Sequence, residues 1–182
     1  MKQESIAPRL DINAFAHAAS AIAGQDLLSK YERLMKETQG LGPDRTLNWA
    51  ARGELRNAAA GVPQVWLHLT LDVSLPLTCQ RCLAPVDIAV AVQRSFRFVD
   101  NEEAAEAQDE EAEEDVLALS REFSLSELIE DEVLMALPAV PRHETCPVEV
   151  KLATADPGFD AATTEKRNPF AVLSKLQGGK SS

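Results

Sequence analysis

The sequence is poor in the residues from which active sites and large cores are usually built. Aromatic residues make up only 5% of its 182 residues, so a core has to rest mainly on Val, Leu, Ile and Ala. The three histidines are scattered, and neither a Gly-rich phosphate loop nor a nucleophile elbow accompanies them. These absences argue against hydrolytic catalysis, and we expect a protein that is not an enzyme.

Long apolar runs are also missing, because no stretch reaches the roughly eighteen apolar residues that a membrane-spanning helix needs. The apolar stretch 12–23 follows Asp11 and is interrupted by Asn13 and His17, which indicates an amphipathic helix and not an export signal. Three cysteines, an odd count without such a signal, are typical of reduced thiols. We therefore expect a cytoplasmic protein with no membrane contact and no small-molecule substrate.

Negative charge is concentrated in one segment. The chain has a formal net charge of -11, and residues 100–115 alone carry ten acidic side chains and no basic one. The remainder is nearly neutral, which disfavours tight RNA binding by the whole surface, since such binding neutralises phosphates with Lys and Arg. We predict that residues 100–120 form an acidic, flexible loop or a frayed helix.

Apolar residues recur with two different periods. Helical spacing occurs over 12–23, 26–38 and 125–137, and the last of these follows a capping box formed by Ser124 and Glu127. Strict alternation predicts strands that begin near Leu47, Val65 and Val86. Each strand has one apolar face, so helices should cover one side of an antiparallel sheet. The predicted fold class is α+β.

The length suits a single domain, 1–182, with its core at about 45–99 and 123–143. Residues 144–167 contain two prolines and should be irregular. A short C-terminal helix is predicted over 168–177, because Asn168 can cap it, Pro169 suits its first position and Gly178 can end it. So short a helix has to dock on the domain or on a partner.

Two cysteine-containing motifs share one spacing. Cys79 and Cys82 lie between two predicted strands, at the tip of a hairpin, and His143 and Cys146 repeat the spacing. These four side chains can form a tetrahedral zinc site, the one cofactor we expect. Alternatively, the first two are buried small hydrophobes and Cys146 is an incidental loop thiol. A redox dithiol is less favoured, since reactive pairs usually open a helix and a strand follows here.

Charged side chains suggest two kinds of contact. The candidates for RNA contact are basic residues of the hairpin and the C-terminal helix: Arg81, Arg94, Arg97, Lys166, Arg167 and Lys175. Trp66, on the polar face of its strand, would offer a stacking surface near them. The candidates for protein contact lie on the polar face of the 125–137 helix: Glu127, Glu130, Asp131 and Glu132. Alternatively, all are ordinary surface residues, and a helix covers Trp66.

Three blocks, LPLTCQRCLAPV at 75–86, LSELIEDEVLMALPAVPRH at 125–143 and NPFAVLSKL at 168–176, resemble the YceD family in order and spacing. The most distinctive positions are Cys79, Gln80, Arg81, Cys82, Leu83, Asn168, Pro169 and Phe170. The resemblance implies a non-catalytic, bacterial ribosome biogenesis factor that supports synthesis, processing or stability of the large-subunit (23S) ribosomal RNA. Some relatives have further cysteines where this chain has only His143 and Cys146.

Two mechanisms fit this resemblance. Acidic surfaces attract Lys- and Arg-rich chains, so the protein can act through a basic ribosomal protein or a pre-ribosomal particle. The alternative is a zinc-ribbon-like module that binds ribosomal RNA directly through the CxxC hairpin.

Overall fold

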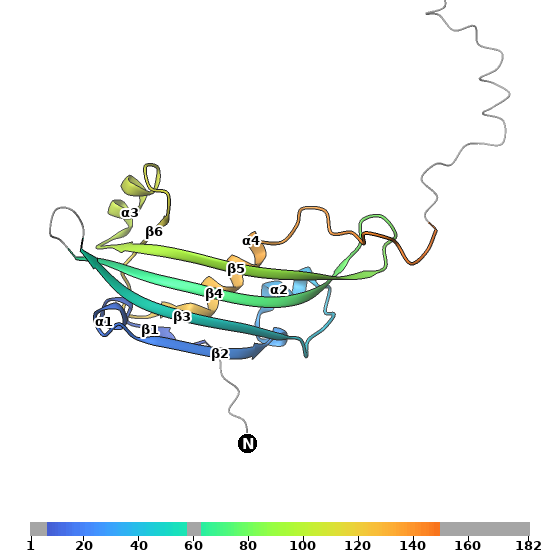
Figure 1. Ribbon diagram of the computed structural model, residues 1–182, viewed down its shortest axis with the longest axis horizontal. Coiled ribbons are helices and arrows are strands. Elements are labelled where there is room, and N and C mark those ends of the chain that lie inside the picture. The colour runs from blue at the N-terminus through green and yellow to red at the C-terminus, as the bar shows by residue number, and fades with distance from the viewer. Residues whose placement is uncertain (1–6, 58–62, 150–182) are drawn as a thin grey trace, which may run out of the picture. The chain divides into compact units, whose positions relative to one another are not determined.

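The computed structural model describes residues 7–57 and 63–149, which form a mixed α+β structure (Figure 1). The chain divides into two units, Met1–Cys146 and Pro147–Ser182, and the first is described below. Its five-stranded sheet has the order β2-β3-β4-β5-β6. The strands are β2 (Ala21–Leu27), β3 (Thr46–Asn57), β4 (Pro63–Thr78), β5 (Pro85–Val99) and β6 (Asp115–Ala118). Neighbours are antiparallel except β5 and β6, so the predicted α+β class is confirmed.

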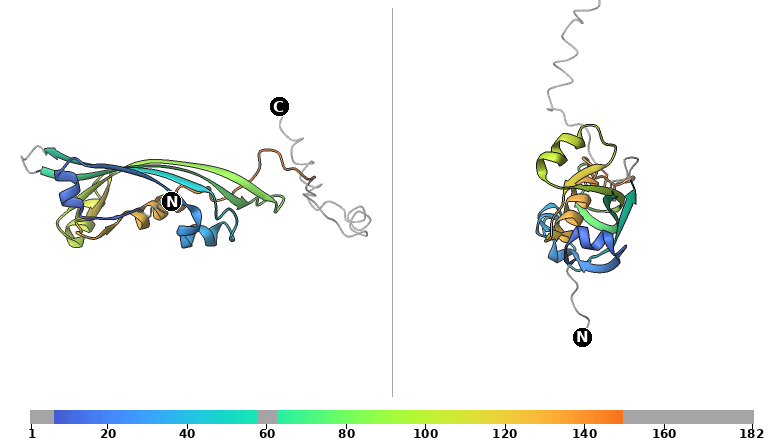
Figure 2. Two further views of the ribbon diagram at one scale, coloured as in Figure 1. Left: turned by 90° about the horizontal axis from the view of Figure 1, so that it is seen from below. Right: turned by 90° about the vertical axis from the view of Figure 1, so that its left-hand side faces the viewer.

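Helices cover one face of this sheet, as Figure 2 shows from below. They are α1 (Ile12–His17), the 3-10 helix η1 (Leu28–Lys30), α2 (Glu32–Glu37) and α4 (Leu125–Met135). A two-stranded sheet pairs β1 (Arg9–Leu10) with β7 (Phe123–Ser124). Alternate residues of β4, such as Leu67 and Leu69, are fully buried with Ile129 and Val133 of α4. The other sheet face, called the open face below, carries the polar residues.

The prediction for the α4 helix is confirmed, and its cap is visible. The Ser124 side chain accepts a hydrogen bond from the Glu127 N–H at 3.4 Å. No helix among the described residues is long and apolar enough to cross a bilayer.

Pro76 lies within β4, where a missing N–H could break a ladder. The pairing of β3 with β4 ends at Asn48 and Asp72, so beyond Asp72 the β3 side of β4 has no partner strand in the described residues. The hydrogen-bonded pair Cys79–Ala84 fixes the alternation, and even-numbered residues of β4 direct their backbone groups toward β3. Pro76 therefore removes no ladder bond, which is the edge position expected of a strand proline.

The predicted helix over 12–23 is wrong beyond His17. The chain turns at Ala19, which has a φ of 45°, and continues as β2 beside β3. A Cβ atom at Gly24 would lie 2.5 Å from the Trp49 ring, so this glycine admits the indole and is no helix stop. The predicted 26–38 helix likewise reduces to η1 and α2. Pairing with β3 and burial of Trp49 override the helix propensity of alanine.

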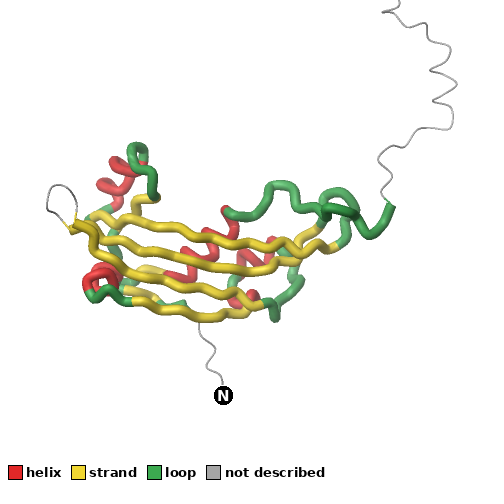
Figure 3. The backbone as a smooth tube through the Cα atoms, in the orientation of Figure 1, coloured by secondary structure: helices red, strands yellow, loops and turns green. Residues whose placement is uncertain are grey.

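Residues 100–120, predicted as a flexible loop or a frayed helix, contain helix α3 (Glu102–Asp109) and strand β6. Asn101 caps α3 through its side chain, which accepts a hydrogen bond from Ala104 N–H at 2.8 Å. Asp109 accepts one from Val116 N–H at 3.0 Å and so joins α3 to β6. The acidic segment is ordered by these local bonds and by two arginines of β5, described below. Figure 3 shows both elements beside β5.

Glu130 of α4 supplies the cap that α2 lacks. The N-cap residue of α2, Tyr31, makes no side-chain cap bond. Instead, Glu130 Oε1 accepts from the backbone N–H groups of Arg33 at 2.7 Å and Leu34 at 3.2 Å, and Oε2 accepts from Arg33 Nε at 2.9 Å. A carboxylate at a helix N-terminus satisfies otherwise unpaired donors and interacts favourably with the helix dipole. Glu130 thus holds α2 on α4.

We predict that Glu130→Ala lowers the free energy of unfolding by about 2–4 kcal/mol, because it leaves the backbone N–H groups of Arg33 and Leu34 at the start of α2 without their acceptor. Asp131→Ala is the matched control. It removes a more exposed partner of the same arginine and should cost less than about 1 kcal/mol. Urea denaturation of both variants measures the difference, and equal costs would contradict the assigned role of Glu130.

Candidate metal centre

The connection between β4 and β5 brings Cys79 and Cys82 together. Cys79 N–H donates to the Ala84 carbonyl, and Leu83 N–H donates to the Cys79 carbonyl, both at 2.9 Å. Leu83 adopts a φ of 61°, which tightens the turn. Cys79 is buried and Cys82 is half-buried, so both sulfurs lie on the inner side of this tip.

The segment after α4 returns to the same tip. Gln80 N–H donates to the Pro141 carbonyl at 2.8 Å, and the His143 ring bonds through Nε2 to the Pro85 carbonyl at 3.1 Å. These contacts carry His143 and Cys146 to the two hairpin cysteines. Two chain segments about sixty residues apart therefore meet at one end of the sheet.

The ligand atoms of Cys79, Cys82, His143 and Cys146 all lie within 4.8 Å of one another. Cys82 Sγ and His143 Nδ1 are 3.4 Å apart. In a tetrahedral zinc site with bonds of about 2.3 Å to sulfur and about 2.0 Å to nitrogen, the ligand atoms of three cysteines and one histidine are separated by roughly 3.5–3.8 Å. The donor set and its spacing therefore fit zinc after small adjustments.

The imidazole of His143 is oriented for such a role. A bond from Nε2 to a carbonyl requires that this nitrogen carries the proton. The lone pair is then on Nδ1, which faces Cys82. Metal-binding histidines commonly have a backbone carbonyl in this second position.

The thiols of Cys79 and Cys146 differ in their electrostatic surroundings. Burial opposes ionisation of Cys79, but the backbone N–H groups of Cys82, His143 and Arg81 outweigh it and lower the pKa of the thiol to about 5. Burial, and then the neighbouring sulfurs, raise the pKa of Cys146. A low thiol pKa is also a property of redox dithiols, but Cys79 is fully buried, whereas attacking thiols are partly exposed. The arrangement suits a closed ligand set better.

The basic candidates for RNA contact lie in different settings. Arg81 is exposed at the tip. Arg94 forms ion pairs with Asp115 and, at 3.7 Å, with Glu132. Arg97 is only 9% exposed. Its guanidinium donates to Glu114 at 2.6 Å and to Gln108 at 2.7 Å. Lys166, Arg167 and Lys175 lie outside the described residues, as do the family positions Asn168, Pro169 and Phe170.

Trp66 is not the exposed stacking surface that alternation suggested. It lies on the open face but is 8% exposed, because the Arg56 guanidinium covers its ring at 4.3 Å from the centroid. An arginine two strand positions from the facing residue can reach over an indole, and strand alternation alone does not reveal this. The alternative prediction was that a helix covers Trp66. The structure shows that Arg56 covers it instead.

Two of the four acidic candidates on α4 are buried and not exposed as predicted. Glu130 caps α2, and Glu132 is 2% exposed beside Arg94. Burial raises the pKa of Glu132, and Arg94 opposes that shift. Asp131 forms an ion pair with Arg33, and Glu127 is exposed. The helix contacts α2 and β5 on two sides, so its polar positions face protein as well as water.

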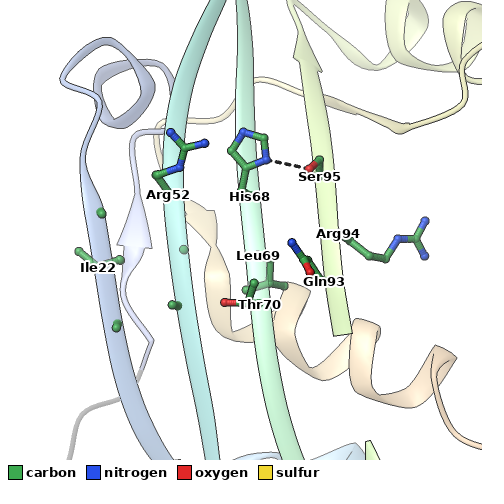
Figure 4. A pocket seen from close by; sticks show the side chains of 12 residues that line it. Ile22, Arg52, His68, Leu69, Thr70, Gln93, Arg94 and Ser95 are labelled. Atoms are coloured by element: carbon green, nitrogen blue, oxygen red, sulfur yellow. Dashed lines mark hydrogen bonds between the residues drawn. The ribbon is translucent and has the colours of Figure 1, made fainter. Parts of the chain in front are cut away.

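A hollow of about 560 Å³ lies on the open face and is floored by small side chains, as Figure 4 shows. Within it, His68 bonds Ser95 Oγ through Nδ1 and Glu54 through Nε2, both at 2.7 Å. Arg56, and after it His68, lower the pKa of Glu54 to about 2. These are the residue types of a catalytic triad, but Ser95 lies within strand β5, and among the described residues no turn or helix N-terminus directly follows it to supply converging N–H donors for an oxyanion. We interpret the hydrogen bonds that join Glu54, His68 and Ser95 as a structural network.

Comparison with known proteins gives the family. The family model described as "Large ribosomal RNA subunit accumulation protein YceD" matches residues 67–177. A protein of that name from Haemophilus influenzae is 31% identical over 108 residues, which are 59% of this chain and 62% of that relative. The match thus spans less than two thirds of the relative, and no solved structure matches this chain. Since the family model covers more than half of the chain and includes both cysteine motifs, the protein belongs to the YceD family.

Proposed function

We propose that this protein supports the accumulation of large-subunit ribosomal RNA as a non-catalytic ribosome biogenesis factor. The observation that carries the proposal is the match of residues 67–177 to a family named for that role. The tip cluster, formed by Cys79, Cys82, His143 and Cys146, resembles a structural metal site. The triad-like set of Glu54, His68 and Ser95 lies on extended strands, without the turn that exposes a nucleophile. Both features favour a binding protein over an enzyme.

The protein acts through a basic ribosomal protein or a pre-ribosomal particle. Support comes from the acidic surface of α3 and the turn after it, whose exposed carboxylates are Glu102, Glu103, Glu106, Asp109, Glu110, Glu111 and Glu113. Glu127 of α4 adds a further exposed carboxylate. Such a surface attracts Lys- and Arg-rich chains and repels nucleic acid.

Zinc bound by Cys79, Cys82, His143 and Cys146 would join the hairpin tip to the segment after α4. A closed set of four protein ligands leaves no position for a substrate, so the ion would be structural. Its contribution is to keep the tip in one conformation for binding.

The alternative is direct contact between the tip and ribosomal RNA. Arg81 and Arg142 are exposed there, and Leu83 is 74% exposed. Two cations beside an apolar side chain can contact a phosphate and an unstacked base. This small basic area contrasts with the acidic surface of α3.

The proposed function predicts that the tagged full chain captures large-subunit ribosomal proteins from lysate, and that ribonuclease treatment leaves them bound. Capture that is lost with ribonuclease, and lost with Arg81→Glu, would support direct RNA contact instead. Arg9→Glu is a control for charge reversal alone, because Arg9 is an exposed arginine of β1 and does not belong to the tip. Recovery of neither ribosomal protein nor ribosomal RNA would refute the proposal.

The metal site predicts about one zinc ion per chain after purification without chelator, measured by mass spectrometry of the metal. Cys82→Ala and His143→Ala should lose it and lower the melting temperature, since metal binding contributes to folding. His17→Ala, at an exposed helix end, is the matched control and should retain the metal. Equal metal content in all three variants would exclude this ligand set.

A further inference from the structure

One side of β5 is unpaired along most of its length among the described residues. Strand β6 pairs with β5 only from Phe96 to Val99, and β4 pairs with its other side along the whole strand. Among the described residues, no backbone hydrogen bond reaches the free side from Asp87 to the N–H group of Ser95. This stretch is called the β5 edge below.

The direction of the backbone groups along β5 follows from three hydrogen bonds. The Ala84 carbonyl accepts from Cys79, toward β4, whereas the Val99 carbonyl accepts from Leu119 and the Pro85 carbonyl from His143, away from β4. In a strand these directions alternate with residue number. Odd-numbered residues of the β5 edge therefore direct N–H and C=O groups outward: Asp87, Ala89, Ala91, Gln93 and Ser95.

The middle of the β5 edge has few of the devices that usually prevent strand addition, since its charged residues, Asp87 and Arg94, lie near its two ends. Between Asp87 and Arg94 it contains no proline, lysine or glycine, and its register with β4 shows no bulge. The opposite edge of the sheet, β2, is seven residues long and carries the buried, inward-pointing Asp26, which is one such device. An added strand therefore fits β5 better than β2.

Uncovered apolar side chains flank the β5 edge. The chain from Glu132 to His143 passes beside it, because Arg94 contacts Glu132 at one end and His143 bonds the Pro85 carbonyl at the other. Among the described residues, this segment makes no backbone hydrogen bond to the β5 edge. Between these anchors, Met135 is 63% exposed and Val140 is 58% exposed. Ile88 and Val92 of β5 are only partly buried against the core. Figure 1 shows this segment passing β5 on its free side.

Charge selects the occupant. The acidic segment 100–115 leads directly into β6, which ends the β5 edge at Phe96. Arg94, the one basic residue within 87–95, is already paired with Asp115 and Glu132. A strand added to β5 would thus have one end beside a strongly acidic surface.

We propose that the β5 edge binds an extended segment of a protein partner, which adds to the sheet as a further strand beside β5, in line with β6. The segment alternates apolar residues, which cover Ile88, Val92 and Met135, with Lys or Arg residues, most of them near β6. This inference rests on the proposed function for the identity of the partner, a basic ribosomal protein. Backbone pairing gives the affinity, and alternate side chains give the specificity.

Amide hydrogen exchange tests the edge directly. The probe is a ten-residue synthetic peptide that alternates Val with Lys, added in excess to the full chain. Exchange at the Ala89, Ala91 and Gln93 amides should slow at least about tenfold, while Val90 and Val92, already bonded to β4, should not change. No slowing at the three odd-numbered amides, or equal slowing by a peptide that alternates Val with Glu, would overturn the proposal.

Variants of Ala91 separate this proposal from the proposed function. Ala91→Pro removes an outward N–H without breaking a bond to β4, and Ala91→Lys adds a charge that repels a basic strand. Both should reduce ribonuclease-resistant capture of ribosomal proteins at least about tenfold, whereas Ala91→Thr should retain it. Melting temperatures near that of the natural chain check that each variant folds.

The outcomes are distinguishable. Undiminished capture by Ala91→Lys would refute the edge proposal and leave the proposed function intact. Absence of capture by the natural chain would refute the proposed function, and the peptide experiment would still decide whether the β5 edge accepts a strand.

Discussion

The antiparallel pairing of β4 with β5 is the constraint on which the rest of the structure depends. It runs without interruption from the Val65–Phe98 pair to the Thr78–Pro85 pair, beyond the point where β3 leaves the sheet. Because the two strands extend past their neighbour, their connecting turn lies at one end of the sheet, and the segment after α4 can reach it. The same pairing uses the even-numbered amides of β5 and leaves the odd-numbered ones outward.

The main strands and the tip cluster could be predicted from the sequence for a physical reason. A sheet with one covered face imposes a period of two, and β4 keeps that period from Val65 to Leu77. The tip cluster could be anticipated because two equally spaced ligand pairs, Cys79 with Cys82 and His143 with Cys146, suit one tetrahedral ion. Their ligand atoms lie within 4.8 Å of one another in the structure, in agreement with that expectation.

The features that could not be predicted depend on single long-range contacts. Strand β2 forms from an alanine-rich stretch because β3 pairs with it and Trp49 needs the space at Gly24. Glu130 and Glu132 follow a polar pattern, yet one caps a helix almost a hundred residues earlier and the other lies beside Arg94. Periodicity describes how a residue faces its own element, and it carries no information about a partner from a distant segment.

The segment between Glu132 and His143 is held at its two ends, and this has a consequence for the tip. Closing about eleven residues onto β5 costs roughly 2–3 kcal/mol of chain entropy. The two hydrogen bonds at its far end, from Gln80 to Pro141 and from His143 to Pro85, contribute about 1 kcal/mol each. Closure is thus close to thermal balance without a further link. The four-ligand cluster lies at this far end, where a bound ion would shift the balance toward the closed position of the segment.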